Sequence, residues 1–345
     1  MKTQNISNKF FFTLILIIAT LLISGIGLAD EFKATVYTKL PDTPEGLCVD
    51  SKGNLYASLV HTGQVVKLQE GGKYEHIAWV PSKEDGGKGG IYGMDTDKND
   101  NIYIAYMERS KYSNLMDPFH TDCRDATVTK SGVYKIDATT REVTAVATRG
   151  DGWPFCFPDD VDLDSAGNIY LSDFTFAGIW KITPDGDVKM WSNHKLLNWS
   201  GPSPLGVNVL VLDKEQKNIY AGCSGDGCVV RIPIKEDGSA GKPVVHARQM
   251  GPIDGIEIDD EGYIYVSDVI RNEISIIPPI QHPFGYPPRL IIANLFNAPL
   301  DNNTSLVLRD GVLYTANLGF THRNWQEADK TVIAIKGFKK PILAK

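Results

Sequence analysis

The chain has 345 residues, a formal net charge of −7 and a hydrophobic fraction of 42%. It contains no block of lysine or arginine residues, so we do not expect nucleic acid or an anionic membrane surface to be its main partner. The length exceeds that of a usual domain but suits one closed ring of β-sheets.

The first 29 residues differ in character from the rest of the chain. Lys2 and Lys9 precede an apolar run from Phe10 to Leu28, and the run ends in small residues before Asp30. This pattern predicts a secretory signal at residues 1–29, and a secreted or periplasmic mature chain that no longer touches a membrane. The run is almost long enough to span a bilayer, so an uncleaved membrane anchor remains the alternative.

A repeat organises the mature chain, at residues 30–345. Segments 44–58 and 252–268 share a polar residue before Gly, a short apolar run, a turn with Asp and Gly, and a second apolar run. This is the pattern of a hairpin of two buried strands. The frame occurs six times, and its variable position falls at Glu45, Tyr92, Asp159, Asn208, Asp254 and Thr304.

The repeats start 46 to 50 residues apart, except for one step of 67. This spacing, with four short apolar runs in each unit, predicts the blades of an all-β, six-bladed β-propeller formed by a single domain. The expected strands of the first blade are 46–50, 55–58, 64–68 and 76–80, and those of the fifth are 255–258, 263–266, 273–277 and 289–293. The sixth has only 305–308, 312–316 and 331–336. We expect the run from Phe32 to Leu40 to supply its missing strand and close the ring.

The long step contains an insertion at residues 108–131. In a propeller, the loops that enter the first strands lie on the same face as the loops between the second and third strands. The insertion lies on this face, and its length is typical of a lid, which we expect, or of a disordered segment. Other residues near this face are candidates for substrate contact, with solvated loop residues as the alternative: His61, His120, Asp160, Arg271 and His322.

Five cysteines in an exported chain allow two disulfide bonds. Cys223 and Cys228 flank the hairpin loop Ser-Gly-Asp-Gly and form one candidate pair. Cys123 and Cys156 form the second, which would attach the insertion beside Asp159. For Cys48 we expect a buried free thiol.

The first strand of each propeller blade lines the central axis, so Glu45, Asp159, Asn208 and Asp254 should converge at one end of the channel. Three carboxylates held together repel one another unless a cation binds them. Oxygen ligands without His or Cys favour Ca²⁺ or Mg²⁺, and Ca²⁺ best tolerates irregular geometry, with Mg²⁺, Mn²⁺ or Zn²⁺ as alternatives. Asp and Asn also occur before Gly for turn geometry alone, but Glu45 does not fit that explanation.

These motifs resemble those of the senescence-marker-protein, gluconolactonase and luciferin-regenerating-enzyme family, six-bladed propellers related to paraoxonases and diisopropylfluorophosphatase. The matching motifs are Pro-Glu-Gly at Glu45, Pro-Asp-Asp at Asp159, the Asn at Asn208 and Pro-Ile-Asp-Gly at Asp254. The resemblance implies that these four residues hold a catalytic calcium and that Asp254 is the general base. Asp159 stands where the family has Asn, and Val209 where it usually has Gly.

The resemblance and the predicted cluster together suggest a monomeric, calcium-dependent hydrolase of small lactones or related esters. The cation would polarise a carbonyl oxygen, and a carboxylate would activate water. No Gly-x-Ser-x-Gly motif is present to supply a serine nucleophile. The alternative is a non-catalytic propeller, a ligand-binding or protein-interaction module in which calcium is structural.

Overall fold

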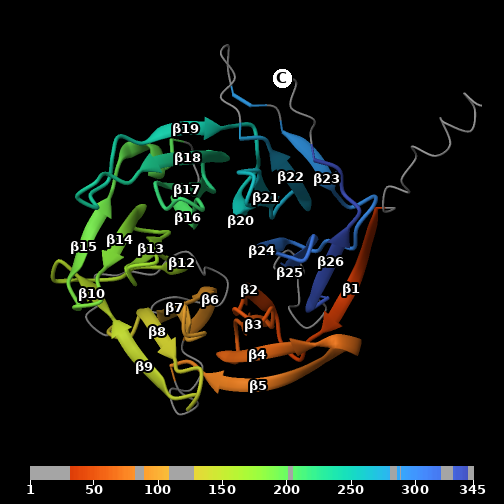
Figure 1. Ribbon diagram of the computed structural model, residues 1–345, viewed down its shortest axis with the longest axis horizontal. Coiled ribbons are helices and arrows are strands. Elements are labelled where there is room, and N and C mark those ends of the chain that lie inside the picture. Colours follow the sequence, from red (N-terminus) through yellow and green to blue (C-terminus); the bar gives the residue numbers. More distant parts are fainter. Residues whose placement is uncertain are drawn as a thin grey trace, which may run out of the picture.

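The computed structural model describes residues 32–81, 89–108, 128–200, 205–279, 286–287, 289–319 and 329–340. The predicted signal and most of the predicted lid therefore lie outside the described residues. Six four-stranded antiparallel sheets surround a central axis and form a six-bladed β-propeller, which confirms the predicted fold (Figure 1). The described part of the chain contains no helix long and apolar enough to cross a membrane.

Each of the first three blades is built from four consecutive long strands. Blade 1 contains β2 (Pro44–Val49), β3 (Leu55–Leu59), β4 (Gln64–Gln69) and β5 (Lys73–Trp79). Blade 2 contains β6 (Gly89–Thr96), β7 (Ile102–Glu108), β8 (Gly132–Ile136) and β9 (Val143–Ala147). The short pair β10 (Arg149–Gly150) and β11 (Trp153–Pro154) precedes blade 3, which contains β12 (Pro158–Leu163), β13 (Ile169–Asp173), β14 (Gly178–Ile182) and β15 (Val188–Ser192).

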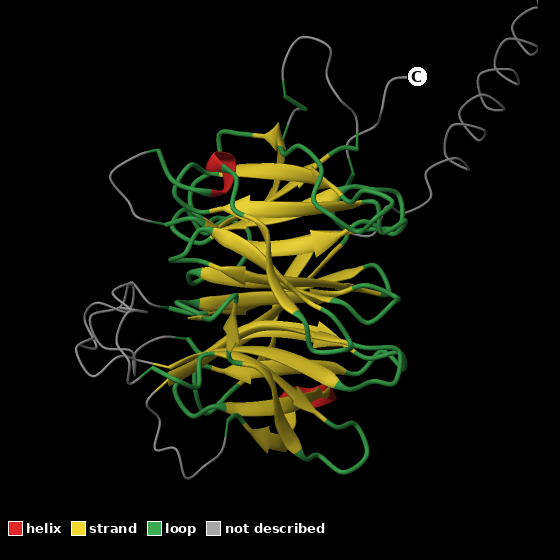
Figure 2. Ribbon diagram, turned by 90° about the vertical axis from the view of Figure 1, so that its left-hand side faces the viewer, coloured by secondary structure: helices red, strands yellow, loops and turns green. Residues whose placement is uncertain are grey.

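The remaining blades follow the same order. Blade 4 contains β16 (Val207–Leu212), β17 (Asn218–Cys223), β18 (Cys228–Pro233) and β19 (Val244–Ala247). Blade 5 contains β20 (Ile253–Ile258), β21 (Ile264–Asp268), β22 (Glu273–Ile277) and β23 (Leu290–Ala293). Blade 6 contains β24 (Asn303–Arg309), β25 (Val312–Asn317) and β26 (Thr331–Lys336). Two 3₁₀ turns are present among the described residues, η1 (Glu70–Gly72) and η3 (Lys195–Leu197), and the side view shows the loops gathered on the two faces of the ring (Figure 2).

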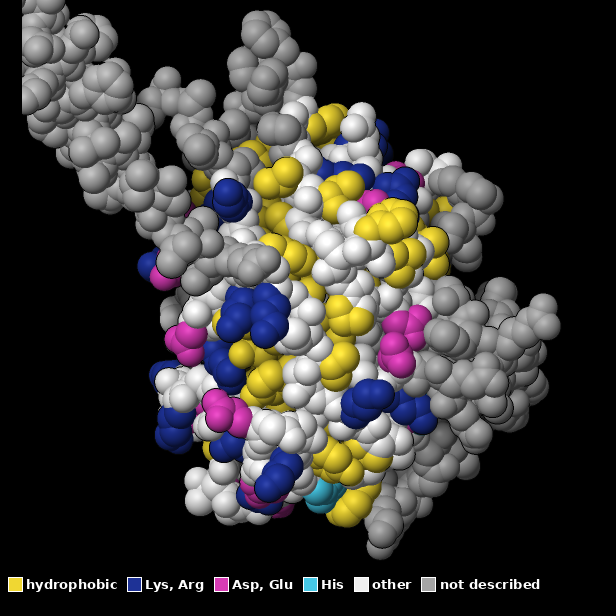
Figure 3. Space-filling view, turned by 90° about the vertical axis from the view of Figure 1, so that its right-hand side faces the viewer, with side chains coloured by type: hydrophobic (Ala, Val, Ile, Leu, Met, Phe, Trp, Pro, Cys, Tyr) yellow, Lys and Arg dark blue, Asp and Glu magenta, His cyan; other side chains and the backbone are white. Residues whose placement is uncertain are grey.

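The first strand of the mature chain closes the ring. β1 (Lys33–Lys39) pairs antiparallel with β26, from Lys33 opposite Lys336 to Lys39 opposite Thr331. The Leu40 N–H extends the pairing by donating to the Lys330 carbonyl at 2.8 Å. The predicted closure is therefore confirmed, and it covers the edge that β26 would otherwise expose. On the side of the ring where β1 and β26 lie, charged side chains of both signs and apolar side chains are interspersed (Figure 3).

The repeated Asp turn has a local cause. In blade 1, Oδ1 of Asp50 accepts the backbone N–H groups of Lys52 and Asn54, while Oδ2 accepts the Asn54 amide and the Tyr56 hydroxyl. Equivalent bonds surround the turn aspartates of the second, third and fifth blades. A single carboxylate thus accepts the hydrogen bonds of the groups in the turn, which explains why the sequence repeats most clearly here.

The hydrophobic core is divided among the blades. Six clusters of buried apolar side chains each join two neighbouring blades, and the cluster between blades 6 and 1 closes the circle. Each blade buries both faces of its sheet in this way, so burial of apolar area holds the blades together.

Cysteine pairing differs from the prediction. Cys223 and Cys228 face one another across β17 and β18, but both are free thiols, so the predicted bridge between them is wrong. The Cys223 thiol instead donates to the Leu196 carbonyl at 3.4 Å, and both thiols pack in the apolar core between blades 3 and 4. Cys48 is a buried free thiol, as expected. The pairing of Cys123 with Cys156 stays a prediction because Cys123 lies outside the described residues.

Candidate metal centre

A backbone irregularity marks the same position in every first strand. The pairing register between the first and second strands shifts around Glu45, Tyr92, Asp159, Asn208, Asp254 and Thr304. A β-bulge bends the strand and re-aims the side chain at that point. The six positions therefore form one ring about the axis. We call the face on which these strands begin the site face.

Hydroxyl groups hold this ring together from blade to blade. Ser58 Oγ accepts the Gly46 N–H at 2.7 Å and donates to the Tyr92 carbonyl at 2.8 Å. Ser224 Oγ donates to the Ile253 carbonyl at 2.5 Å, and Thr304 Oγ1 donates to the Glu45 carbonyl at 2.9 Å. Each bond satisfies a backbone group that the bulge removes from the sheet ladder, so the ring positions are rigidly spaced.

Three of the four predicted ligands come together as carboxylates. Glu45, Asp159 and Asp254 each offer an oxygen atom, and these atoms lie within 4.8 Å of one another. Asn208 joins them because its Nδ2 donates to Asp254 Oδ1 at 2.8 Å. The same nitrogen also lies 3.1 Å from Ser224 Oγ. The sequence prediction that these four residues meet is thus realised in the geometry.

Hydrogen bonds do not satisfy every buried oxygen atom of this cluster. In the described part of the chain, Glu45 Oε2, Asp159 Oδ2 and Asn208 Oδ1 are buried oxygen atoms without a hydrogen-bond partner. A buried polar atom left unpaired costs roughly 1–3 kcal/mol, so three together in one cluster need a compensating group. All three are oxygens, which a hard cation such as Ca²⁺ prefers. The residues present therefore fit a bound divalent cation.

The electrostatics of the cluster agree with this fit. Burial raises the pKa of Glu45 well above its usual value, and the charges of Asp159 and Asp254 raise that pKa further. The pKa of Asp159 is likewise raised, first by burial and then by Asp254 and Asp160. Burial also raises the pKa of Asp254 to about 6, against the opposing effect of the Asn208 hydrogen bond. These shifts favour protonation of the cluster when no cation is bound, and a divalent ion would compete with the protons.

Asp160 has a different position from its neighbour Asp159. Its Oδ2 accepts the Leu210 N–H at 3.0 Å, so it links blade 3 to blade 4 instead of joining the cluster. Burial raises its pKa to about 8. A Cβ atom at Gly93 would overlap Asp160 Oδ1, so only glycine at that position leaves space for the carboxylate.

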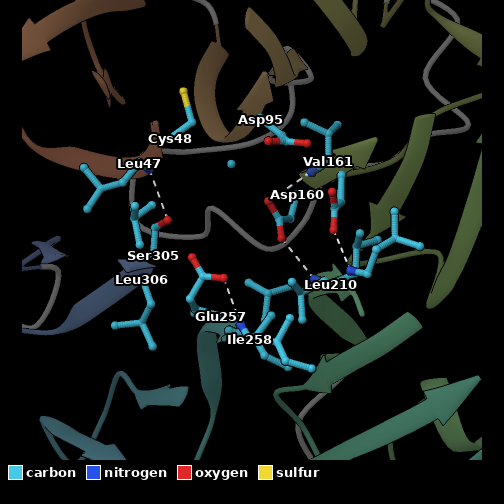
Figure 4. Close-up of a pocket in the computed structure, with 18 of the residues that line it drawn as sticks. Leu47, Cys48, Asp95, Asp160, Val161, Leu210, Glu257, Ile258, Ser305 and Leu306 are labelled. Atoms are coloured by element: carbon cyan, nitrogen blue, oxygen red, sulfur yellow. Dashed lines mark hydrogen bonds between the residues drawn. The ribbon is translucent and has the colours of Figure 1, made fainter. Parts of the chain in front are cut away.

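The cluster borders a cavity of about 420 Å³ that runs along the axis toward the opposite face. The further acids that line this cavity include Asp95, Asp162 and Glu257, and Figure 4 shows Asp95, Asp160 and Glu257 around its open centre. Each lies three positions after the ring residue of its own blade, a shared offset that the repeat alignment contains but that sequence reasoning did not use.

These three acids accept hydrogen bonds from the axial edges of the first strands. Asp95 accepts the Leu163 N–H at 3.1 Å, Asp162 accepts the Leu212 N–H at 2.6 Å and Glu257 accepts the Leu308 N–H at 3.2 Å. The first strand of each blade has no strand on its axial side, so its N–H groups need such acceptors. The channel acids are therefore structural links between neighbouring blades.

Among the predicted substrate-contacting loop residues, His61 and Arg271 belong to the part of the chain that the structure describes. The His61 N–H donates to Asp42 Oδ2 at 3.0 Å. Arg271 is half exposed, and its Nη1 lies 3.5 Å from Asp268 Oδ2. His120 and His322 lie outside the described residues. A role in substrate contact stays a prediction for all of them.

Comparison with solved structures shows the same fold in several proteins. A gluconolactonase from Xanthomonas campestris superposes with a TM-score of 0.64 at 12% identity, over 90% of this chain and 91% of that one. A putative gluconolactonase gives a TM-score of 0.62 at 14% identity, covering 89% and 92%. An auxiliary nutrient binding protein from Bacteroides thetaiotaomicron also gives 0.62, at 8% identity, covering 90% and 78%.

No family model and no curated protein matches the sequence. At such low identity the structural similarity establishes the propeller fold alone, and proteins of this fold catalyse reactions or bind ligands. Function must therefore be argued from the residues of the cluster.

Proposed function

We propose that this protein is an exported, calcium-dependent hydrolase of lactones or related esters. The observation that carries the proposal is the cluster of Glu45, Asp159 and Asp254 within 4.8 Å, with three buried oxygens of the centre lacking partners. The gluconolactonases among the structural neighbours support the same substrate class. The apolar run at residues 10–28 supports export.

Glu45, Asp159, Asn208 and Asp254 would hold the ion, each through a side-chain oxygen. A bound calcium ion would supply Lewis-acid polarisation of the substrate carbonyl. The orientation of Asn208 is set by its amide nitrogen, which donates to Asp254 and leaves Oδ1 as the ligand atom. Glu45 and Asp159 are buried and Asp254 is partly buried, so the cluster is largely shielded from bulk water, which strengthens its electrostatic effect.

Asp254 is the residue that we assign to proton transfer. Its Oδ1 accepts the Asn208 amide, and its second carboxylate oxygen would take a proton from the attacking water. Burial already raises its pKa to about 6, close to the range in which a general base works well. Glu45 and Asp159 would remain ligands without a proton to carry.

The direct test is hydrolysis of a panel of lactones and aryl esters by the purified mature chain, with excess calcium and with excess chelator. We expect turnover that chelator abolishes and calcium restores. Hydrolysis that is insensitive to chelator would contradict the metal-dependent mechanism. If metal raises the melting temperature but no substrate is turned over, the site is structural and the protein is a binding module.

A further inference from the structure

Exposed apolar side chains are distributed unevenly between the two faces of the ring. Among the described residues, the loops of the site face expose five large apolar side chains, those of Trp153, Phe176, Ile270, Leu295 and Phe296. The described Asp turns on the opposite face, which join the first and second strands, expose no such side chain. The other exposed large apolar side chains belong to outer strands or to the segment before β23, namely Val36, Tyr74, Val244, Tyr286, Leu290 and Ile291.

Trp153 and Phe176 form one group on the site face, which we call the blade 3 tip. Trp153 lies in the β10–β11 hairpin and is 60% exposed, and Phe176 lies between β13 and β14 and is 39% exposed. The Phe176 ring lies 5.5 Å from the Trp180 ring, and Gly150, which pairs with Trp153, packs against the same ring. Both residues of the hairpin turn have positive φ, so a defined turn holds Trp153 in solvent.

Ile270, Leu295 and Phe296 form the second group, which we call the blade 5 tip. Ile270 is 50% exposed and lies between β21 and β22, while Leu295 is 60% exposed and follows β23. Ile274 of β22 pairs with Ala293 of β23. Ile270 and Leu295 therefore extend beyond the same end of two paired strands, on the site face.

The turn that carries Phe296 is fixed by hydrogen bonds. Asn294 Oδ1 accepts the Phe296 N–H at 2.9 Å, and Asn297 Oδ1 accepts the Asn294 N–H at 2.8 Å. The Asn294 carbonyl accepts the Ala298 N–H at 2.9 Å, and Ala298 is buried in the core between blades 5 and 6. Phe296 is nevertheless 98% exposed, so an ordered turn presents an aromatic side chain that packs against nothing in the protein.

An arginine accompanies each tip. Arg149 is exposed and pairs with Pro154 in the hairpin of the blade 3 tip. Arg271 directly follows Ile270 and is half exposed. At a membrane surface, tryptophan lies at the level of the headgroups and long arginine side chains extend to the phosphates. Apolar side chains flanked by arginine therefore suit a phospholipid surface.

The arrangement of the tips favours a lipid surface over a protein partner. Blade 4 separates blade 3 from blade 5, so the tips do not form one continuous patch (Figure 1). Each tip has only two or three apolar side chains, whereas a standard protein interface uses roughly 20–30 residues on each side. A planar, deformable surface can accept both tips at once. The net charge of −7 disfavours anionic lipid and leaves a zwitterionic surface.

We propose that the site face docks on a zwitterionic phospholipid surface, with the blade 3 tip and the blade 5 tip inserted at the headgroup boundary and their arginines at the phosphates. No residue of the carboxylate cluster takes part, so the inference is independent of the hydrolase function. It replaces the expectation from the sequence that the mature chain does not touch a membrane.

The experiment measures flotation of the mature chain with phosphatidylcholine vesicles. The mature chain is required because the apolar run at residues 10–28 would itself bind lipid. We expect the wild type to float with the vesicles. The double variant Leu295→Ser, Phe296→Ser and the single variant Trp153→Ser should each lower the partition coefficient by about 10-fold or more, since each removes exposed apolar surface. Their melting temperatures should match the wild type.

Tyr74→Ser is the matched control, because Tyr74 is 42% exposed on the outer strand β5, away from the site face, and its loss should leave partitioning unchanged. A wild type that does not float, or tip variants that float equally well, would overturn the inference. Binding that requires added phosphatidylglycerol would overturn the zwitterionic surface. A lipid-free wild type whose mass increases with concentration, while the double variant stays monomeric, would assign the blade 5 tip to contact between two copies instead.

Discussion

The side-chain amide of Asn208 donates to Asp254 Oδ1 at 2.8 Å, and this single bond orders the centre. It connects blade 4 to blade 5 and, among the described residues, leaves Asn208 Oδ1 buried without a hydrogen-bond partner. It also favours the ionised form of Asp254 against the effect of burial. The Asn208 amide nitrogen thus orients Asp254, while the amide oxygen is itself a proposed ligand atom. This double role explains how four residues from four blades form one site.

Calcium should stabilise the folded protein. The unfolded chain has no assembled site, so a metal that binds only the folded state raises its free energy of unfolding by mass action, by about 2.7 kcal/mol at a concentration 100-fold above Kd. Thermal unfolding in excess calcium and in excess chelator measures the difference. Identical melting curves in the wild-type chain would contradict metal binding, and Glu45→Gln should show a smaller shift at the same calcium concentration.

Asp159→Asn should have opposite effects with and without metal. In the folded state burial, Asp254 and Asp160 raise the pKa of Asp159, so this group costs stability increasingly as the pH rises from the ordinary Asp range to the raised pKa, and the full cost is present above it. Neutral Asn removes this cost, and the melting temperature in chelator at about pH 8 should rise by a few degrees.

The same substitution removes one negative charge from the proposed ligand set, so calcium affinity should fall on the order of 10-fold, which is about 1.4 kcal/mol. Calorimetric titration gives this value on the same samples. Asp185→Asn, in an exposed turn of blade 3, is the matched control for loss of one charge. A metal-free variant that melts below the wild type at about pH 8 would show that the carboxylates do not repel one another.

Calcium affinity should fall as the pH is lowered. Burial raises the pKa of Asp254 to about 6, and the pKa values of Glu45 and Asp159 are raised as well, so the metal-free site holds protons that calcium must displace. Affinity should drop by up to about 10-fold per pH unit for each proton released, most clearly below about pH 6. Calorimetry in buffers of different ionisation enthalpy counts these protons. A Kd that does not change with pH would contradict the proton-retaining cluster.

Asp254→Asn and Glu45→Gln should impair activity in different ways. Asn at position 254 keeps the size of the side chain but cannot accept the proton, so turnover at saturating calcium should fall roughly 10²- to 10⁴-fold. Gln at position 45 weakens the metal site, and additional calcium should recover much of the activity. Calcium titrations of kcat for both variants make the comparison. The assignment fails if calcium rescues Asp254→Asn as readily as Glu45→Gln.

Deletion of the mature N-terminus through Leu40 should destabilise the ring. It removes β1 and leaves the outer edge of β26 with unpaired backbone groups, which promotes aggregation. Melting temperature and light scattering of the truncated chain, compared with a chain that begins at Phe32, report the effect. A truncated protein that stays monomeric and melts like the longer one would show that β1 is dispensable for closure.

The repeat predicted most of the fold because interactions between residues close in sequence produce it. Asp50 bonds to groups two, four and six residues further along the chain, so the turn, the two strands that flank it and the blade period can be read from a short segment. The missing strand of blade 6 and the apolar run at residues 32–40 then identified the closure. The ring positions followed from propeller geometry, which brings equivalent residues of the blades to one axis.

Only the tertiary structure decided which contacts form between blades. Asp95, Asp162 and Glu257 look like ordinary strand residues, and their role as acceptors depends on N–H groups 50 or more residues away. The sequence places Cys223 and Cys228 opposite one another, and only the structure shows that both are free thiols in the core between blades 3 and 4. The ring contacts of Phe157 with Tyr92 also join residues from separate repeats. Such contacts depend on how the closed ring positions neighbouring blades, and no local pattern encodes that placement.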